Sequence, residues 1–226
     1  ASFCYARIPS KPLHVDASKL DSRNPFKAVR FVREDAFFRW TIVAWMFMGF
    51  GNLVMSPLRV EYLANPVYGI ALSARDVALY TAVIPAVVRL IASPIWGLVF
   101  DRANFMVMRI ILNFGLGTSI IAFFTGNSIA GLALGSIIFG VSIAGGDVAW
   151  SLWVTKFSPP ERVAEYMSVH TFFTGVRGVI APLVGFALIE RYPVAVLGWF
   201  CFGLIMIGTV ILVPEIRSAR VQAAQR

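Results

Sequence analysis

The chain has 226 residues, of which 58% are hydrophobic and only 14% charged, and its formal net charge is +8. A soluble domain of this length would be about one-quarter charged, so the composition excludes an ordinary soluble protein. The apolar residues form blocks of roughly 20, the length at which an α-helix crosses about 30 Å of hydrocarbon. Strands of a β-barrel would alternate apolar and polar residues instead. We therefore expect an all-α polytopic membrane protein.

The N-terminal region precedes the first apolar block. Residues 1–24 are polar and mixed in charge, which predicts a linker or tail outside the membrane. Residues 25–39 begin with a proline after Asn24 and place Phe26, Val29 and Val32 at helical spacing between basic residues. This pattern predicts an amphipathic helix in the membrane interface, and a solvated connector is the alternative.

Six membrane spans follow within residues 40–213, and residues 214–226 form a polar tail. Turns rich in Pro, Gly and Asn separate the spans, as expected for breaks between helices. The predicted spans cover residues 40–56 with an extension to 63, 77–100, 108–124, 129–155, 163–189 and 194–213.

The distribution of positive charge predicts the orientation of these spans. Fifteen of the twenty Lys and Arg residues lie in the N-terminal segment, the C-terminal tail and the loops after the second and fourth spans. Arg59, Arg75 and Arg191 are assigned to the other side. Such an excess marks the cytoplasmic side. We therefore expect cytoplasmic termini and a bacterial inner membrane location, and we ascribe the net charge to topology, with no nucleic-acid partner.

Ionisable residues inside the spans are the candidates for function, because a charge in hydrocarbon requires a partner or water. Asp147 and His170 are predicted at similar depth, where they could meet and carry protons, and Arg89 and Arg177 could bind an anion or gate the protein. Thr174 shares a helical face with His170, and Asn52 is the polar residue of the first span. The third and sixth spans, without an ionisable interior residue, are expected to face lipid. The alternative is a static network in which Asp147 neutralises an arginine.

Other sequence patterns argue for packing and against catalysis. Glycines predict close helix approach: Gly131, Gly135, Gly145 and Gly146 in the fourth span, and Gly175 and Gly178 in the fifth. The two cysteines, Cys4 and Cys201, lie near opposite ends of the chain and predict no disulfide framework. No phosphate-binding loop, metal-ligand cluster or catalytic triad spacing is present. We expect neither enzymatic activity nor a cofactor.

The loop between the second and third spans carries a family resemblance. Gly97, Asp101, Arg102 and Asn104, followed by Arg109, resemble the signature of the major facilitator superfamily. Residues 181–185, Ala-Pro-Leu-Val-Gly, are similar to the Gly/Pro pattern of that family's fifth or eleventh helix. Asn104 stands where the family has Gly, and since Asn tolerates a left-handed backbone, the turn is expected to survive.

The resemblance implies that this chain is one six-helix half, the C-terminal one, of a transporter built from two halves. Asp101 would then contact the start of the fifth span when the cytoplasmic gate closes. Spans one, two, four and five would line a substrate cavity. The resemblance implies secondary transport of a small solute by alternating access with a second half. Two arginines against one aspartate inside the spans favour an anionic or zwitterionic solute, and Asp147 and His170 could couple its transport to protons.

The alternative hypothesis is a transporter-like structural or assembly subunit of a larger membrane complex without transport activity. The expected partners are accordingly a second half or a larger complex, together with membrane lipid and, for a transporter, the small-molecule solute.

Overall fold

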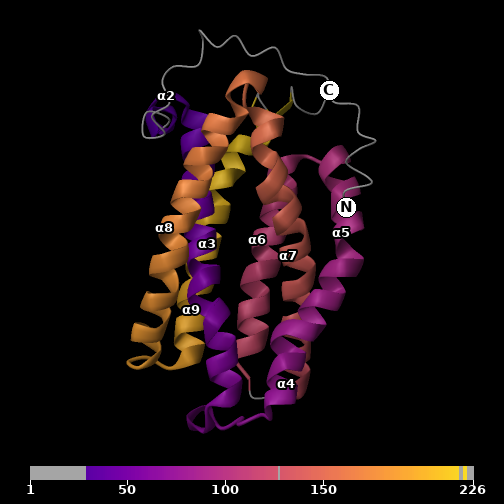
Figure 1. Cartoon of the computed structure of the whole chain (residues 1–226), viewed down its shortest axis with the longest axis vertical. Helices are drawn as coiled ribbons and strands as arrows, with labels where there is room; N and C mark the ends of the chain where they lie inside the picture. The colour runs from indigo at the N-terminus through magenta and orange to yellow at the C-terminus, as the bar shows by residue number, and fades with distance from the viewer. Residues whose placement is uncertain (1–28, 127, 219–220, 223–226) are drawn as a thin grey trace.

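The structure, a computed structural model, describes residues 29–126, 128–218 and 221–222. Within these ranges the secondary structure is helical, and six helical segments are long and apolar enough to cross a membrane (Figure 1). This confirms the predicted all-α, polytopic membrane fold. The long segments are α3 (Ala36–Ala64), α4 and α5 (Ala74–Ala78 and Ile84–Arg102), α6 (Phe105–Phe124), α7 (Ile129–Phe157), α8 (Val163–Ile189) and α9 (Val194–Leu212).

The first span begins earlier than predicted. Asp35 has an extended backbone, and its side chain accepts a hydrogen bond from the amide of Phe38 at 3.0 Å, which caps α3. The preceding helix α2 covers only Phe31–Glu34. Residues 36–39 therefore belong to the first span and not to a separate interfacial helix. The predicted tail at residues 1–24, the start of that interfacial helix and most of residues 219–226 lie outside the described residues.

The second span contains a π-helical turn, η4 (Leu79–Val83), between α4 and α5. Pro85 follows it at the start of α5 and has no amide hydrogen, so the regular hydrogen-bond pattern is interrupted there. The freed carbonyl of Tyr80 accepts a hydrogen bond of 2.7 Å from Ser136 of α7. The interruption thus ties the second span to the fourth.

The helices pack in two matching groups. Helix α3 packs beside α8 and α9, helix α7 packs beside α5 and α6, and α6 and α9 pack against each other. If spans one, two and three are exchanged with spans four, five and six respectively, the same pairs of helices remain in contact. Successive spans run in opposite directions (Figure 1), so the two three-helix groups are related by inverted topology.

Glycines allow several of these approaches, as the small residues of membrane helices commonly do. Gly140 of α7 lies against the Pro85 carbonyl, and Gly185 of α8 lies against the Val54 carbonyl of α3. Gly135 packs against Phe123 of α6, and Gly131 packs against the carbonyl of Ala122, which confirms the close approach predicted for these two.

Helix α2, the connection between α7 and α8, and the C-terminal η6 turn (Val213–Arg217) lie at one end of the bundle (Figure 1). The connections between α3 and α4 and between α8 and α9 lie at the other end. We name these the α2 end and the opposite end. The six spans thus run between these two ends of the bundle.

Candidate functional site

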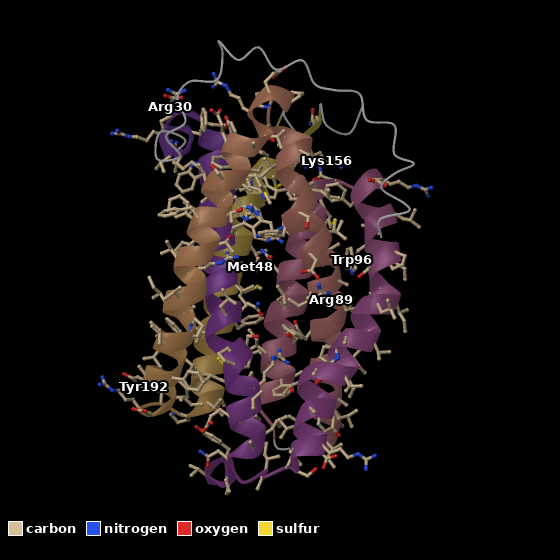
Figure 2. The ribbon with its side chains drawn as sticks, viewed as in Figure 1. Arg30, Met48, Arg89, Trp96, Lys156 and Tyr192 are labelled. Atoms are coloured by element: carbon tan, nitrogen blue, oxygen red, sulfur yellow. The ribbon has the colours of Figure 1, made fainter. Side chains whose placement is uncertain are left out.

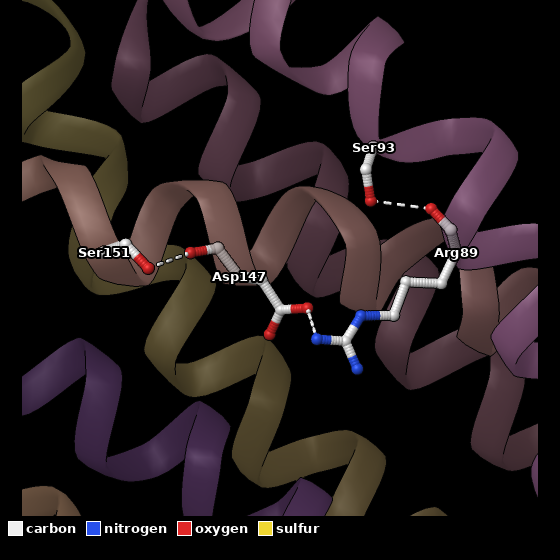
Figure 3. Close-up of polar contacts among 4 residues, drawn as sticks. All are labelled: Arg89, Ser93, Asp147 and Ser151. Carbon is white, nitrogen blue, oxygen red and sulfur yellow. Dashed lines mark hydrogen bonds and ion pairs between the residues drawn. The ribbon is translucent and has the colours of Figure 1, made fainter. Parts of the chain in front are cut away.

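An ion pair joins α5 and α7 in the interior of two apolar spans. The Arg89 Nη2 atom lies 2.6 Å from Asp147 Oδ2 (Figure 3). The neighbouring serines do not take part, since Ser93 donates to the Arg89 carbonyl at 2.6 Å and Ser151 to the Asp147 carbonyl at 2.8 Å. The two serine hydroxyls therefore do not bond the charged groups, and Arg89 and Asp147 pair with each other.

This ion pair is not buried within the chain. The side chain of Arg89 is 54% exposed and that of Asp147 is 48% exposed. Figure 2 places Arg89 between the end that holds Lys156 and the end that holds Tyr192. An ion pair facing hydrocarbon at this depth would be strongly unfavourable. Its exposed side therefore requires water or another protein surface in the membrane.

A second polar centre is closed and surrounds Trp45 of α3. The Arg109 guanidinium of α6 lies 3.5 Å above the indole ring, a cation–π contact. The Arg177 guanidinium of α8 donates a hydrogen bond to the Trp45 carbonyl. The His170 ring of α8 lies 5.1 Å from the indole. Arg109, Arg177 and His170 are all buried, so two helices, α6 and α8, bring three cationic or basic groups to one tryptophan of α3. We call this the Trp45 cluster.

Trp153 of α7 determines how His170 is held. Its indole Nε1 lies 3.2 Å from His170 Nδ1. An indole N–H can only donate, so Nδ1 accepts and the imidazole proton resides on Nε2. Trp45, Trp150 and Trp153 surround the imidazole at ring distances of 5.1 to 5.5 Å. This arrangement holds His170 in a neutral, fixed orientation.

The expected meeting of Asp147 and His170 does not occur. Asp147 pairs with Arg89 of α5, whereas His170 bonds Trp153, and no hydrogen bond or ion pair joins the two residues. Similar depth was expected from their residue numbers, but their helices present them to different neighbours. The prediction that Asp147 neutralises an arginine is confirmed for Arg89.

Two other predicted residues contribute less. Thr174 lies on the same helix as His170 and Arg177, and its hydroxyl has no hydrogen-bond partner among the described residues. Asn52 is partly buried on α3, one turn beyond Gly49, whose Cα faces the Arg177 guanidinium. Neither residue forms a hydrogen bond with the Trp45 cluster in the part of the chain that the structure describes.

The signature loop is built differently from the expectation. Asn104 has φ −62° and ψ 121°, which is extended and not left-handed. Its Oδ1 caps α6 by accepting from Met106 and Val107, and its Nδ2 donates to the Ile216 carbonyl at 3.1 Å. The prediction of a left-handed turn is wrong: Asn104 is a helix cap that ties the loop to the C-terminal turn.

The remaining signature residues lie in two environments. Asp101 and Arg102 are exposed at the α2 end of α5, and a Cβ built on Gly97 would meet no neighbour. Lys156 of α7 donates to the Phe100 carbonyl at 2.8 Å and interacts electrostatically with Asp101. Arg109, expected in the same loop, is instead buried in α6. The third span therefore does contain an ionisable interior residue, contrary to the prediction.

The predicted position of Arg59 was also wrong. It was assigned to an outer turn, but it lies within α3 and is buried. Its guanidinium donates to Ser119 at 3.3 Å and lies 4.5 Å and 4.2 Å from the rings of Phe123 and Phe139. The signal available was the extension of the first span to Leu63, through Leu58, Val60 and Tyr62.

No group of three His, Cys, Asp or Glu side chains that could hold a metal ion occurs in the described ranges. The two polar centres are an open ion pair on α5 and α7 and a closed cluster of donors around Trp45. Comparisons with known protein families, with curated proteins and with solved structures gave no match to this chain.

Proposed function

We propose that this chain is one half of a secondary transporter for a small anionic solute. The observation that supports this most directly is the half-exposed Arg89–Asp147 ion pair within two apolar spans. A wet surface at this depth is what a transporter needs between its two halves and what a lipid-facing helix avoids. The ion pair would line the solute pathway.

The packing pattern supports the same proposal. Two three-helix groups of inverted topology are the building plan of each half in many secondary transporters. Here α3 and α7 occupy equivalent places, as do α5 and α8, and α6 and α9. The resemblance of the signature loop to the major facilitator superfamily agrees with this arrangement.

The surface of α5 and α8 fits a second half as partner. These two spans bury the smallest share of their residues within the chain. A groove of about 770 Å³ runs along α8 between Ala164 and Val179, and a Cβ on Gly175 or Gly178 would meet no neighbour. These glycines were expected to pack within the chain. We propose that they instead admit helices of the second half, either a separate chain or a second copy.

The balance of charge favours an anionic solute. Arg89, Arg109 and Arg177 lie inside the spans with Asp147 as the acidic counterpart, an excess of positive charge. A solute carboxylate or phosphate would compete with Asp147 for Arg89. The proton would then be carried by Asp147, because its carboxylate can accept a proton once the solute has displaced it from the Arg89 guanidinium.

The proposed orientation places the α2 end in the cytoplasm of a bacterial inner membrane. Arg30, Arg102, Lys156 and Arg162 lie near this end, whereas Arg75 and Arg191 lie near the other. Moving Arg59 and Arg109 into the spans leaves the asymmetry in place, and such an asymmetry marks the cytoplasmic side.

Uptake by proteoliposomes tests the proposal. The purified particle, with any chains that accompany it, is expected to accumulate a radiolabelled organic anion under an inward proton gradient. Asp147→Asn should abolish the response to the gradient and Arg89→Gln should abolish uptake, whereas Arg75→Gln, at the opposite end, should leave both unchanged. Uptake of cations alone, or equal uptake by all four proteins, would refute the proposal. A particle that contains unrelated subunits and transports nothing would favour the assembly role.

A further inference from the structure

The Trp45 cluster is unusual because it contains donors without acceptors. Buried atoms with no hydrogen-bond partner include Nε and Nη1 of Arg109, Nε of Arg177 and Nε2 of His170. Because Nδ1 of His170 already accepts from Trp153, its unpartnered Nε2 is an N–H donor. Three side chains thus present N–H groups to the interior of the bundle.

The cluster also lacks negative charge. Arg109 is 1% exposed and Arg177 is 7% exposed, and neither forms an ion pair with an acidic side chain in the part of the chain that the structure describes. The one acceptor that faces Arg177, the Trp45 carbonyl, is already used. Two guanidinium groups that interact electrostatically with each other are therefore buried together. Burial of like charges without a counterion is strongly unfavourable.

Arg59 shows how this chain stabilises a buried arginine in another way. Its guanidinium lies 4.5 Å and 4.2 Å from the ring centroids of Phe123 and Phe139 and donates to Ser119. Its Nη1 has no hydrogen-bond partner, but no second cation interacts with it. Arg109 also donates one hydrogen bond, from Nη2 to Asn113 Oδ1 at 3.3 Å, but it has one aromatic contact, to Trp45, and shares its surroundings with Arg177. The aromatic contacts explain Arg59 but leave the Trp45 cluster with an excess of charge and of donors.

We propose that the Trp45 cluster binds a small anion of halide size between Arg109 and Arg177, with the His170 Nε2–H as a third donor. Charge selects the anion, and burial limits its size. The Arg177 guanidinium lies against Gly49 without space for a Cβ. A larger solute would have to displace this packing. The anion is a resident counterion that joins α3, α6 and α8, and its binding does not depend on transport.

Chloride dependence of the purified full chain in detergent tests this inference. Chloride is exchanged for gluconate, which is too large for a closed site, at constant ionic strength and pH. Chloride is expected to raise the melting temperature saturably by at least about 2 °C, with bromide acting alike. Equilibrium dialysis with labelled chloride should give one ion bound per chain. An identical melting temperature in both salts, with no bound chloride, would overturn the proposal.

Matched variants identify the site. Arg109→Gln and Arg177→Gln should each abolish the chloride response, whereas Arg59→Gln, which removes a buried arginine outside the cluster, should retain it. Equal chloride dependence of all three variants would place the anion elsewhere and overturn the assignment. Because a charge variant of the core can fail to fold, His170→Asn serves as a second test: it keeps an acceptor for Trp153 but alters the third donor, and should weaken chloride binding severalfold. Unchanged binding by this variant would remove His170 from the site.

Discussion

Trp153 donates its indole N–H to His170 Nδ1 across 3.2 Å, and both residues are buried between α7 and α8. The bond makes the imidazole a structural acceptor with its proton on Nε2. A proton could reach Nδ1 only if this hydrogen bond broke. His170 is therefore better suited to positioning α8 than to relaying protons, and Asp147 is left as the candidate carrier.

The first prediction follows from this bond. His170→Asn places an amide oxygen near the position of Nδ1, so Trp153 keeps an acceptor, whereas His170→Leu leaves the buried indole N–H unsatisfied. We expect the Leu variant to be less stable than the Asn variant by about 1–3 kcal/mol, although Leu is more apolar. Thermal unfolding in detergent measures the difference. A Leu variant as stable as the Asn variant would show that the hydrogen bond contributes nothing.

The sequence predicted the fold well because hydropathy reports directly on membrane spans. Predicted span five matches α8 at both ends, and span six matches α9 to within one residue. Span three began three residues too late, since the Asn104 cap was interpreted as a left-handed turn. Apolar composition defines the middle of a span, whereas its end depends on side-chain hydrogen bonds that hydropathy does not register.

The candidate site was less predictable, for a physical reason. Depth along the membrane follows from residue number, but the direction in which a side chain points depends on which helices are neighbours. Residue numbers could therefore suggest similar depths for Asp147 and His170 but not their partners: Asp147 pairs with Arg89 and His170 with Trp153. Arg109 was assigned to a loop because it is a charged residue that closely follows a polar turn. The stacking on an aromatic ring that stabilises a buried arginine leaves no periodic pattern in the sequence.

The second prediction concerns Asn104, whose side chain caps α6 and bonds the Ile216 carbonyl. Asn104→Gly would suit a left-handed turn but removes both interactions. It should destabilise the protein by about 0.5–2 kcal/mol, a few tenths from the lost cap and the rest from the lost hydrogen bond to Ile216. Asn104→Asp keeps the cap and loses only the donor to Ile216, and should be less destabilising. The two variants are compared by chemical unfolding. A Gly variant more stable than the Asp variant would contradict the observed backbone conformation.

The third prediction uses two glycines with opposite surroundings. The Cα of Gly49 faces the Arg177 guanidinium, whereas a Cβ on Gly146 would meet no neighbour. Gly49→Ala should displace Arg177 from the Trp45 carbonyl and destabilise the protein by about 1–3 kcal/mol. Gly146→Ala should be neutral or stabilising by about 0.5–1 kcal/mol, because alanine favours the helix. Equal effects of the two substitutions on thermal stability would refute the close contact.

The fourth prediction concerns the proposed partner surface. Gly178 of α8 has open space around it, so Gly178→Leu should leave the stability of the chain itself nearly unchanged. If a second half packs against α8, the same side chain would obstruct it and reduce the proportion of the larger particle in native mass measurements. Leu183→Phe, on an exposed position of the same helix nearer the opposite end, is a control for added bulk. An unaltered particle mass with Gly178→Leu would exclude close packing at this glycine.

The last prediction asks whether the Arg89–Asp147 ion pair faces water. Ser93 and Ser151 follow the two charged residues by one helical turn on α5 and α7, whereas Phe114 of α6 and Val210 of α9 are exposed apolar residues. With Cys4 and Cys201 replaced by alanine, single cysteines at these four positions report water, because a thiol must ionise to react with a charged maleimide. We expect labelling at positions 93 and 151 to be at least about tenfold faster than at 114 and 210. Equal rates would show that the ion pair does not face water, and would remove the main support for a solute pathway.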